Sequence, residues 1–317
     1  MEVIDLHCDT IYRLYMDKNK YGLKENPYHI DIGKLIKGNS IAQFFALYID
    51  LLKAKELNHR PYEAANKLLK LFCSEVEKNS DVIGIAKNYL ELEENIRKGK
   101  LSGFLTIEEG GAIEGSIEYL RNFYNEGVRL ITLTWNYPNE IGYPNYYEEF
   151  SDKGLTPFGI EVVEEMNRLG MLVDVSHLSD GGFYDVLKYS KKPIVASHSN
   201  ARAIKNHSRN LTDHMIKELA EKGGVMGINF CVDFLSNGNI SRVEDMVKHI
   251  KHIYNIGGID VIGLGSDFDG IDCSLEIKDF SQMDKLIYAL RKNGFTEGEV
   301  EKICNGNIKR IIKDVLK

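Results

Sequence analysis

Short runs of β-forming residues alternate with amphipathic helical stretches along the whole chain, and this alternation constrains the fold more than any other feature. Eight runs are predicted strands, and they cover residues 3–7, 41–48, 103–107, 129–135, 171–176, 194–198, 224–230 and 261–266. Several intervening stretches have a helical period, as in 116–125, 158–169, 213–221 and 243–256. Repeated β-α units of this kind predict parallel strands joined by helical crossovers.

Eight such units can close into a (β/α)8 barrel of the TIM type, so we predict an α/β fold of this kind. No linker interrupts the series, and we therefore expect one catalytic domain over residues 1–317 with a helical excursion at about 53–79. A doubly wound sheet is the alternative, because the spacing of strands along a sequence does not prove that the sheet closes.

The charge balance argues against nucleic acid or an anionic membrane as a partner. The chain has 40 Lys and Arg against 47 Asp and Glu, a formal charge of −7, and no long basic run. Its longest apolar stretch, 41–52, is shorter than the roughly 20 residues that span a bilayer. The acidic Glu2 and Asp5 do not fit a signal peptide, so we expect a cytoplasmic protein.

The five cysteines are scattered without a C-x-x-C pair, and an odd number cannot all pair within one chain. We predict that they are reduced. The sequence also lacks the H-E-x-x-H, G-x-x-x-x-G-K-[ST] and G-x-S-x-G motifs. It therefore does not predict the kinds of catalytic site that these motifs form.

Polar side chains follow the predicted strands where a parallel barrel collects its reactive groups, at the carboxyl ends. Three of the nine histidines lie at such ends, together with several carboxylates. These residues are His7, Asp9, Glu108, Glu109, His177, His198, Asp267 and Asp269. We expect them to converge on one site.

Local spacing limits which of these side chains can share a site. His7 and Asp9 are one residue apart, so the period of two in a strand turns both toward the same face. Glu108 and Glu109 are adjacent, so only one can face the barrel axis, and the residues alone leave the choice open. Asp174 lies before the end of its strand, where we expect a salt bridge.

Imidazole and carboxylate without thiolate favour Zn²⁺ in a hydrolytic site, although Mn²⁺, Co²⁺ or Fe²⁺ would accept the same ligands. The candidate ligands exceed what one open tetrahedral ion uses. A pair of ions about 3.5–4 Å apart is therefore expected.

Five motifs together resemble the membrane (renal) dipeptidase family, and the similarity runs from residue 5 to about residue 311. They are D-L-H-C-D at 5–9, I-E-E-G-G at 107–111, V-D-V-S-H at 173–177, S-H-S at 197–199 and S-D-F-D-G at 266–270. The resemblance implies a (β/α)8 barrel with two zinc ions, in a bacterial-type member of the family. It also implies a dipeptidase whose substrates have a free C-terminal carboxylate and include those with a C-terminal D-residue.

The resemblance assigns a ligand to each metal position. It implies that one zinc is held by His7 and Asp9 and the other by His177 and His198. Glu109 would bridge both ions, which selects it over Glu108, and a hydroxide between the metals would be the nucleophile.

Further roles follow from the same resemblance. Asp267 matches the family's catalytic acid and base, and Arg209 matches the arginine that grips the terminal carboxylate of the substrate. Trp135 replaces a histidine that usually helps to stabilise the oxyanion, so Trp135 or its neighbour Asn136 is expected at the substrate. Cys231 stands where mammalian members carry a tyrosine that contacts the substrate.

Two other functions stay open. The same metal site could act on lactones, phosphotriesters or cyclic amides, and Arg209 is the residue that discriminates these from dipeptides. A non-catalytic metal-binding or assembly protein is the second alternative, with Trp135 as the mark of lost activity. The predicted partner is a small dipeptide, and a homodimer is only a family expectation.

Overall fold

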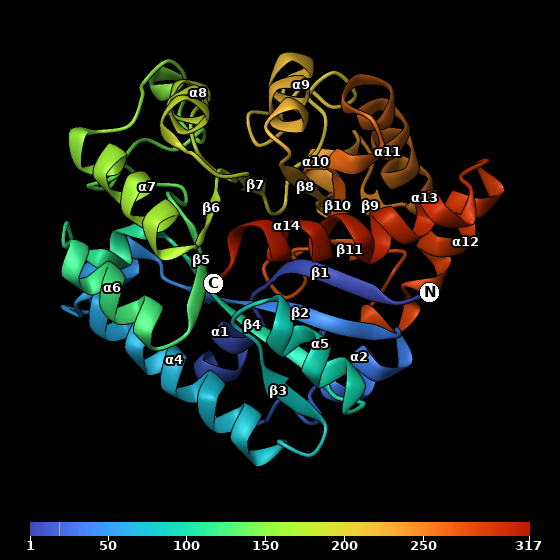
Figure 1. Cartoon of the computed structure of the whole chain (residues 1–317), viewed down its shortest axis with the longest axis horizontal. Helices are drawn as coiled ribbons and strands as arrows, with labels where there is room; N and C mark the ends of the chain where they lie inside the picture. Colours follow the sequence, from blue (N-terminus) through green and yellow to red (C-terminus); the bar gives the residue numbers. More distant parts are fainter. Residues whose placement is uncertain (19) are drawn as a thin grey trace.

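The computed structural model describes residues 1–18 and 20–317, and its centre is a barrel of parallel strands (Figure 1). Each strand pairs in parallel with the next in the order β1 (Val3–Cys8), β2 (Ser40–Tyr48), β4 (Leu101–Glu108), β5 (Val128–Thr132), β6 (Leu172–Asp174), β7 (Val195–Ala196), β8 (Val225–Ile228) and β10 (Ile262–Leu264). The two ends of this series meet where the Asp9 N–H donates to the Phe268 carbonyl at 2.9 Å. This nearly closed barrel of eight strands confirms the predicted fold.

Three short strands were not predicted from the sequence. Strand β3 (Ile83–Ile85) pairs with the first half of β4, whose second half pairs with β5. Strands β9 (Ile240–Ser241) and β11 (Ser274–Leu275) form a separate two-stranded sheet. Runs of two or three residues are too short to show a period of two, so pattern reasoning does not find them.

Helices surround the barrel in Figure 1. They are α1 (Thr10–Met16), α2 (Ile32–Lys37), α3 (Leu51–Glu56), α4 (Pro61–Lys78), α5 (Tyr89–Arg97), α6 (Ile117–Asn125), α7 (Pro157–Leu169), α8 (Asp180–Tyr189), α9 (Asp213–Glu221), α10 (Val232–Leu235), α11 (Val243–Gly257), α12 (Asp284–Lys292), α13 (Glu297–Glu301) and α14 (Asn307–Val315). The helical excursion predicted at 53–79 is divided between α3 and α4. Pro61 begins α4, where the N–H that proline lacks would have no helical partner.

The inside of the barrel is closed at its amino end by α14. Ile4 and Phe44 from the strands pack in one apolar cluster with Ile308 and Ile311 of this helix. Figure 1 shows α14 crossing the middle of the ring of elements. The Asn305 side chain, just before α14, donates to the Glu2 carbonyl at 2.9 Å and ties this plug to the start of β1. The interior of the barrel is therefore open only at its carboxyl end.

A second and larger apolar cluster lies between the strands and the outer helices. Within residues 1–18 and 20–317, no helix is both long and apolar enough to cross a membrane.

Candidate metal centre

Glu108, the last residue of β4, lies in the middle of three imidazoles. Its Oε2 is 3.4 Å from His7 Nε2, while its Oε1 is 3.2 Å from His177 Nε2 and 3.4 Å from His198 Nε2. All four side chains are buried. The structure thus brings together the three histidines that the sequence placed at strand ends.

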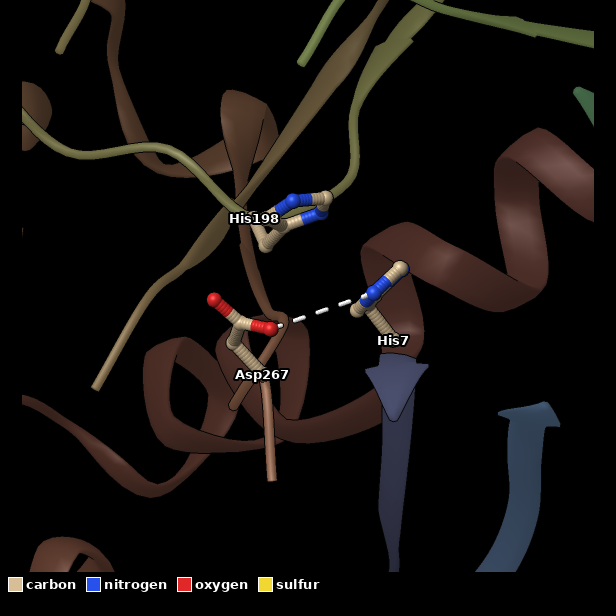
Figure 2. A group of neighbouring side chains, drawn as sticks. All are labelled: His7, His198 and Asp267. Atoms are coloured by element: carbon tan, nitrogen blue, oxygen red, sulfur yellow. Dashed lines mark ion pairs between the residues drawn. The ribbon is translucent and has the colours of Figure 1, made fainter. Parts of the chain in front are cut away.

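Two further carboxylates complete the cluster. Asp9 Oδ2 lies 3.3 Å from His7 Nε2, and Asp267 Oδ1 lies 3.9 Å from the same nitrogen. Figure 2 shows Asp267 facing His7 and His198, which come from distant parts of the chain. Three groups could each hold a cation, namely His7–Asp9–Glu108, Glu108–His177–His198 and His7–His198–Asp267. The first two share Glu108, which is the arrangement of a bridging ligand.

The prediction that Glu109 is the bridge is wrong in this structure, because its carboxylate points away from the histidines. Glu109 leaves the strand with φ 101°, and its oxygens accept hydrogen bonds from Gly111 N at 2.7 Å, Trp135 N at 3.0 Å and the Asn139 amide. The strand pairing continues through Glu108, so that residue keeps the inward position. Glu109 instead fixes the loop that follows β5.

Positive φ angles occur at three other residues of the site, including Asp269 with φ 70°. His177 has φ 67° and Asp267 has φ 61°, values that L residues rarely adopt. Asp9 has left the strand as well, since it is the N-cap residue of α1 with φ −105°. The period of two that placed His7 and Asp9 on one face therefore does not extend to Asp9, although both reach the same centre.

A buried carboxylate behind the cluster orients His198. Asp174 accepts hydrogen bonds from Ser197 N at 2.8 Å and Ser197 Oγ at 2.5 Å, and Ser197 Oγ lies 2.7 Å from His198 Nδ1. Because the hydroxyl donates to Asp174, it accepts from His198 Nδ1–H, and the Nε2 lone pair then faces the centre. The salt bridge expected for Asp174 is absent among the described residues, since hydroxyls and amides satisfy its carboxylate.

Asn136 has the same orienting role for His177. Its Oδ1 lies 2.9 Å from His177 Nδ1, and it also lines the cavity above the centre. Trp135 lines that cavity too, with its ring centre 5.0 Å from Tyr48 and 5.5 Å from Tyr137. The predicted substrate residues Trp135 and Asn136 are therefore at the cavity, and Asn136 in addition holds a candidate ligand.

The donor atoms of the cluster fit bound cations. Among residues 1–18 and 20–317, both ring nitrogens of His7 and Oδ1 of Asp9 are buried without a hydrogen-bond partner, which is costly unless something else satisfies them. His177 Nε2 and His198 Nε2 are 3.0 Å apart. Two nitrogen ligands of one tetrahedral zinc lie at a similar distance, about 3.3 Å, because each bond is about 2.0–2.1 Å long.

The pKa values of these buried groups reflect a dense cluster of charge. Burial would raise the pKa of Glu108, but the surrounding histidines hold it well below its usual value. Burial and the Glu108 charge raise the pKa of Asp9 to about 6, and burial lowers the pKa of His177 to about 4. Burial would lower the pKa of His7, but the charges of Glu108 and Asp9 raise it well above its usual value. Divalent cations would take the place of protons here and neutralise the crowded carboxylates.

Asp267 has the properties of a general acid and base. Its side chain is buried at the wall of the cavity, and its Oδ2 accepts a hydrogen bond from Asn229 Nδ2 at 2.9 Å. Burial raises its pKa to about 7. A carboxyl group that titrates near neutral pH can take up and release a proton during turnover.

Arg209 is a buried cation with open hydrogen-bond donors. Only 4% of the residue is exposed, and its Nη2 donates to the His198 carbonyl at 3.2 Å. Its Nε and Nη1 have no partner among the described residues, and the guanidinium carbon lies 5.3 Å from the Phe234 ring centre. Two open donors on a planar fork are suited to a carboxylate.

A cavity of about 380 Å³ opens onto the cluster. Its wall includes Asp9, Tyr48, Glu108, Trp135, Asn136, His177, Cys231, Phe234, Asp267 and Cys273. The predicted substrate residue Cys231 is thus at the cavity as well. A larger cavity of about 770 Å³, at the amino end of the barrel near Asn307 and Arg310, contains none of these residues.

Sequence reasoning missed the residues that orient the candidate site. Asp174 was assigned a different role, and Asn229 and Asn139 were not assigned one. Asn229 follows β8 directly, so its position at a strand end was a signal that could have identified it. Asn139 lies in a long loop, where no pattern indicated its contact with Glu109.

Comparison with known proteins identifies the family. The profile of the membrane dipeptidase family, peptidase family M19, matches residues 1–317. An uncharacterized dipeptidase of Schizosaccharomyces pombe is 30% identical over 333 aligned positions, which cover 98% of this chain and 80% of that protein.

Two solved structures have the same fold. The dipeptidase AC, a metallopeptidase of family M19, has a TM-score of 0.91 at 26% identity, with 100% of this chain and 99% of that chain covered. A metallopeptidase from Rhodobacter sphaeroides, liganded with a phosphinate mimic of the dipeptide L-Ala-D-Ala, has a TM-score of 0.90 at 26% identity, with 99% of both chains covered. The chain therefore belongs to the membrane dipeptidase family of metallopeptidases, peptidase family M19.

Proposed function

We propose that the protein is a dinuclear metallo-dipeptidase that hydrolyses dipeptides with a free C-terminal carboxylate, including those with a C-terminal D-residue. The observation that carries this proposal is Glu108 facing three buried imidazoles, with the open donors of Arg209 beside His198. The phosphinate mimic of L-Ala-D-Ala on the Rhodobacter sphaeroides relative supports the D-residue.

Two ions would be held by ligands that share one carboxylate. His7 and Asp9 would hold the first ion, His177 and His198 the second, and Glu108 would bridge them. Zinc is the first choice, and Mn²⁺, Co²⁺ or Fe²⁺ suit the same donors. When bound, the ions supply an activated water as nucleophile and polarise the scissile carbonyl.

Arg209 selects substrates by their terminal carboxylate. The His198 carbonyl and the Phe234 ring hold the guanidinium in place, so its open Nε and Nη1 donors are already oriented. A dipeptide has its free carboxylate one residue beyond the scissile bond. An anchor at a fixed distance from the candidate ligand His198 therefore favours dipeptides over longer chains.

Asp267 moves the proton. Asn229 holds one oxygen of this carboxylate, while the other faces His7 and the centre. Asp267 takes a proton from the attacking water and delivers it to the amine that leaves. Loss of a general acid and base commonly slows an enzyme by roughly 10²–10⁴-fold.

The test combines metal analysis of the purified protein with a substrate panel. We expect two ions per chain and cleavage of Ala-D-Ala and Ala-Ala, with little cleavage of the amidated dipeptides, a lactone or a phosphotriester. Equal cleavage of amidated and free dipeptides would remove Arg209 as the anchor. Preference for the lactone or phosphotriester would replace the dipeptidase with a related hydrolase.

Two variants assign the roles. Asp267→Asn should keep both ions and lose turnover by roughly 10²–10⁴-fold. Arg209→Ala should mainly raise KM for the free dipeptides, while the exposed Arg97→Ala serves as control. Normal turnover of Asp267→Asn would show that the proton moves through another group.

A further inference from the structure

Two of the free cysteines lie together on one wall of the active-site cavity. Cys231 directly precedes α10, Cys273 directly precedes β11, and each thiol shifts the pKa of the other. Both line the cavity that holds Asp267. The segments are also joined by backbone pairing, since β11 pairs with β9 a few residues beyond α10.

The cysteine pair is connected to the catalytic carboxylate by one side chain. Cys231 N donates to Asn229 Oδ1 at 2.6 Å, and Asn229 Nδ2 donates to Asp267 Oδ2 at 2.9 Å. A change in the position of Cys231 would therefore move the amide that holds Asp267.

The two thiols differ in reactivity. Cys273 is only partly buried, and the neighbouring Cys231 thiol and Val232 backbone lower its pKa to about 7. The pKa of Cys231 is raised by the Cys273 thiol and by burial. Burial also raises the pKa of Cys8, Cys73 and Cys304. Cys273 is thus the cysteine with the most thiolate near neutral pH, and Cys231 is beside it to resolve a mixed disulfide.

We propose that Cys231 and Cys273 are a redox-active thiol pair, which forms an intramolecular disulfide with a small-molecule disulfide and thereby slows the peptidase. The Cys273 thiolate attacks the oxidant and releases one small thiol. The Cys231 sulfur then gives up its proton and attacks the Cys273 sulfur, which releases the second small thiol. The two cysteines are oxidised, and the oxidant is reduced to two thiols.

The expected loss of activity follows from the length of the new bond. A disulfide is about 2.05 Å long, shorter than any non-bonded contact between two sulfurs, so Cys231 and Cys273 must move toward each other. Movement of Cys231 pulls its N–H away from Asn229 and loosens Asp267. Misplaced catalytic groups cost up to roughly 10²-fold in rate. This effect on rate rests on the proposed function, whereas the disulfide itself does not.

The experiment treats the metal-loaded full chain with oxidised glutathione and follows mass, metal content and dipeptide cleavage. We expect a loss of two hydrogens, a peptide map that links Cys231 to Cys273, unchanged metal content and a fall in kcat of roughly 10-fold to 10²-fold. Dithiothreitol should reverse every change. The variant Cys73→Ser should respond like the unchanged protein, while Cys273→Ser and Cys231→Ser should form no such link and keep their own activity under oxidant.

Each of the other possible results contradicts one part of the proposal. Absence of the 231–273 link in the peptide map rejects the thiol pair, whether or not the protein cleaves dipeptides. A link without a change in kcat rejects the control of activity, as does an equal loss of activity in Cys273→Ser. Loss of metal on oxidation would contradict the explanation that activity falls because Asn229 no longer holds Asp267. A protein that forms the link but never cleaves dipeptides refutes the proposed function alone.

Discussion

Residues at the centre of the site and directly beside it adopt backbone conformations that are costly for L residues. Glu109, His177 and Asp267 have φ values of 101°, 67° and 61°. Such conformations cost about 1–3 kcal/mol each and persist only where the surroundings fix them. Here those surroundings are side-chain hydrogen bonds, from Asn139 to Glu109, between Asn136 and His177, and from Asn229 to Asp267.

The adjacent Glu108 and Glu109 provide the sharpest test of the site. Glu108→Gln should lose bound metal and activity, because an amide cannot replace a bridging carboxylate. Glu109→Gln should keep its metal and lose stability by about 1–3 kcal/mol, because a buried N–H loses its acceptor. Metal analysis and urea unfolding of both variants measure this, and the opposite pattern would restore Glu109 as the bridge.

Gly270 is required by the close approach of the chain to the site. A Cβ at this position would overlap with Asp9 Oδ2 and Asp267 Oδ1. Gly270→Ala should therefore displace both carboxylates and reduce kcat/KM by up to roughly 10²-fold. Gly298→Ala is the control, because nothing lies within 4 Å of its Cβ. Equal kcat/KM for the two variants would show that the loop can move aside without loss.

The sequence predicted the convergence of His7, His177 and His198, because each follows a β-rich run long enough to recognise. It could not choose between Glu108 and Glu109, since that choice depends on the residue at which β4 stops pairing. Asp174 was beyond prediction for another reason. Its hydroxyl and amide partners come from neighbouring strands, and no local sequence pattern indicates these contacts.

At the scale of elements, helix α14 closes the amino end of the barrel interior. Ile308 on this helix is fully buried against the inward side chains of the strands. Ile308→Ala should destabilise the protein by about 2–5 kcal/mol through lost burial and a cavity. Lys313→Ala on the exposed face of the same helix removes only a contact with the Tyr89 ring and should change stability by less than about 1 kcal/mol.

Urea unfolding compares these variants, and a kcat measurement accompanies it. Because α14 is at the amino end and the candidate metal centre at the carboxyl end, kcat of the folded Ile308→Ala protein should be unchanged. An Ile308→Ala protein as stable as Lys313→Ala would mean that the barrel interior does not depend on α14.

Element prediction succeeded where a run was long and failed where it was short. The eight barrel strands were found, although β5, β6, β7, β8 and β10 are shorter than predicted. Strands β3, β9 and β11 have too few residues for a period. The order of strands around the barrel followed the chain, so topology needed no contact information.

On the scale of the whole molecule, the two ends of the barrel have separate tasks. The amino end is apolar and closed by α14, while the carboxyl end holds buried carboxylates and imidazoles around an open cavity. Apolar burial at one end therefore offsets the cost of buried charge at the other. For a buried titratable group outside the candidate metal centre, a shifted pKa therefore affects the free energy of unfolding and not the metal site.

His249 is such a group, and it predicts how stability depends on pH. This fully buried imidazole accepts from Ala201 N at 3.0 Å and donates to the Leu235 carbonyl at 3.0 Å, and burial lowers its pKa to about 4. In the unfolded chain its pKa is about 6.5, so between these values the unfolded state binds the extra proton. Stability from His249 is therefore present above about pH 6.5 and is lost as the pH falls toward 4.

Urea unfolding at neutral pH and at about pH 5 measures this loss, which should be about 2 kcal/mol for His249. The variant His249→Gln should lack that part of the decrease, whereas the exposed His59→Gln should keep it. Buried histidines at the metal centre contribute equally to all three proteins, so the difference between variants isolates His249. Identical pH dependence in His249→Gln and the unchanged protein would mean that the imidazole can take up a proton without unfolding.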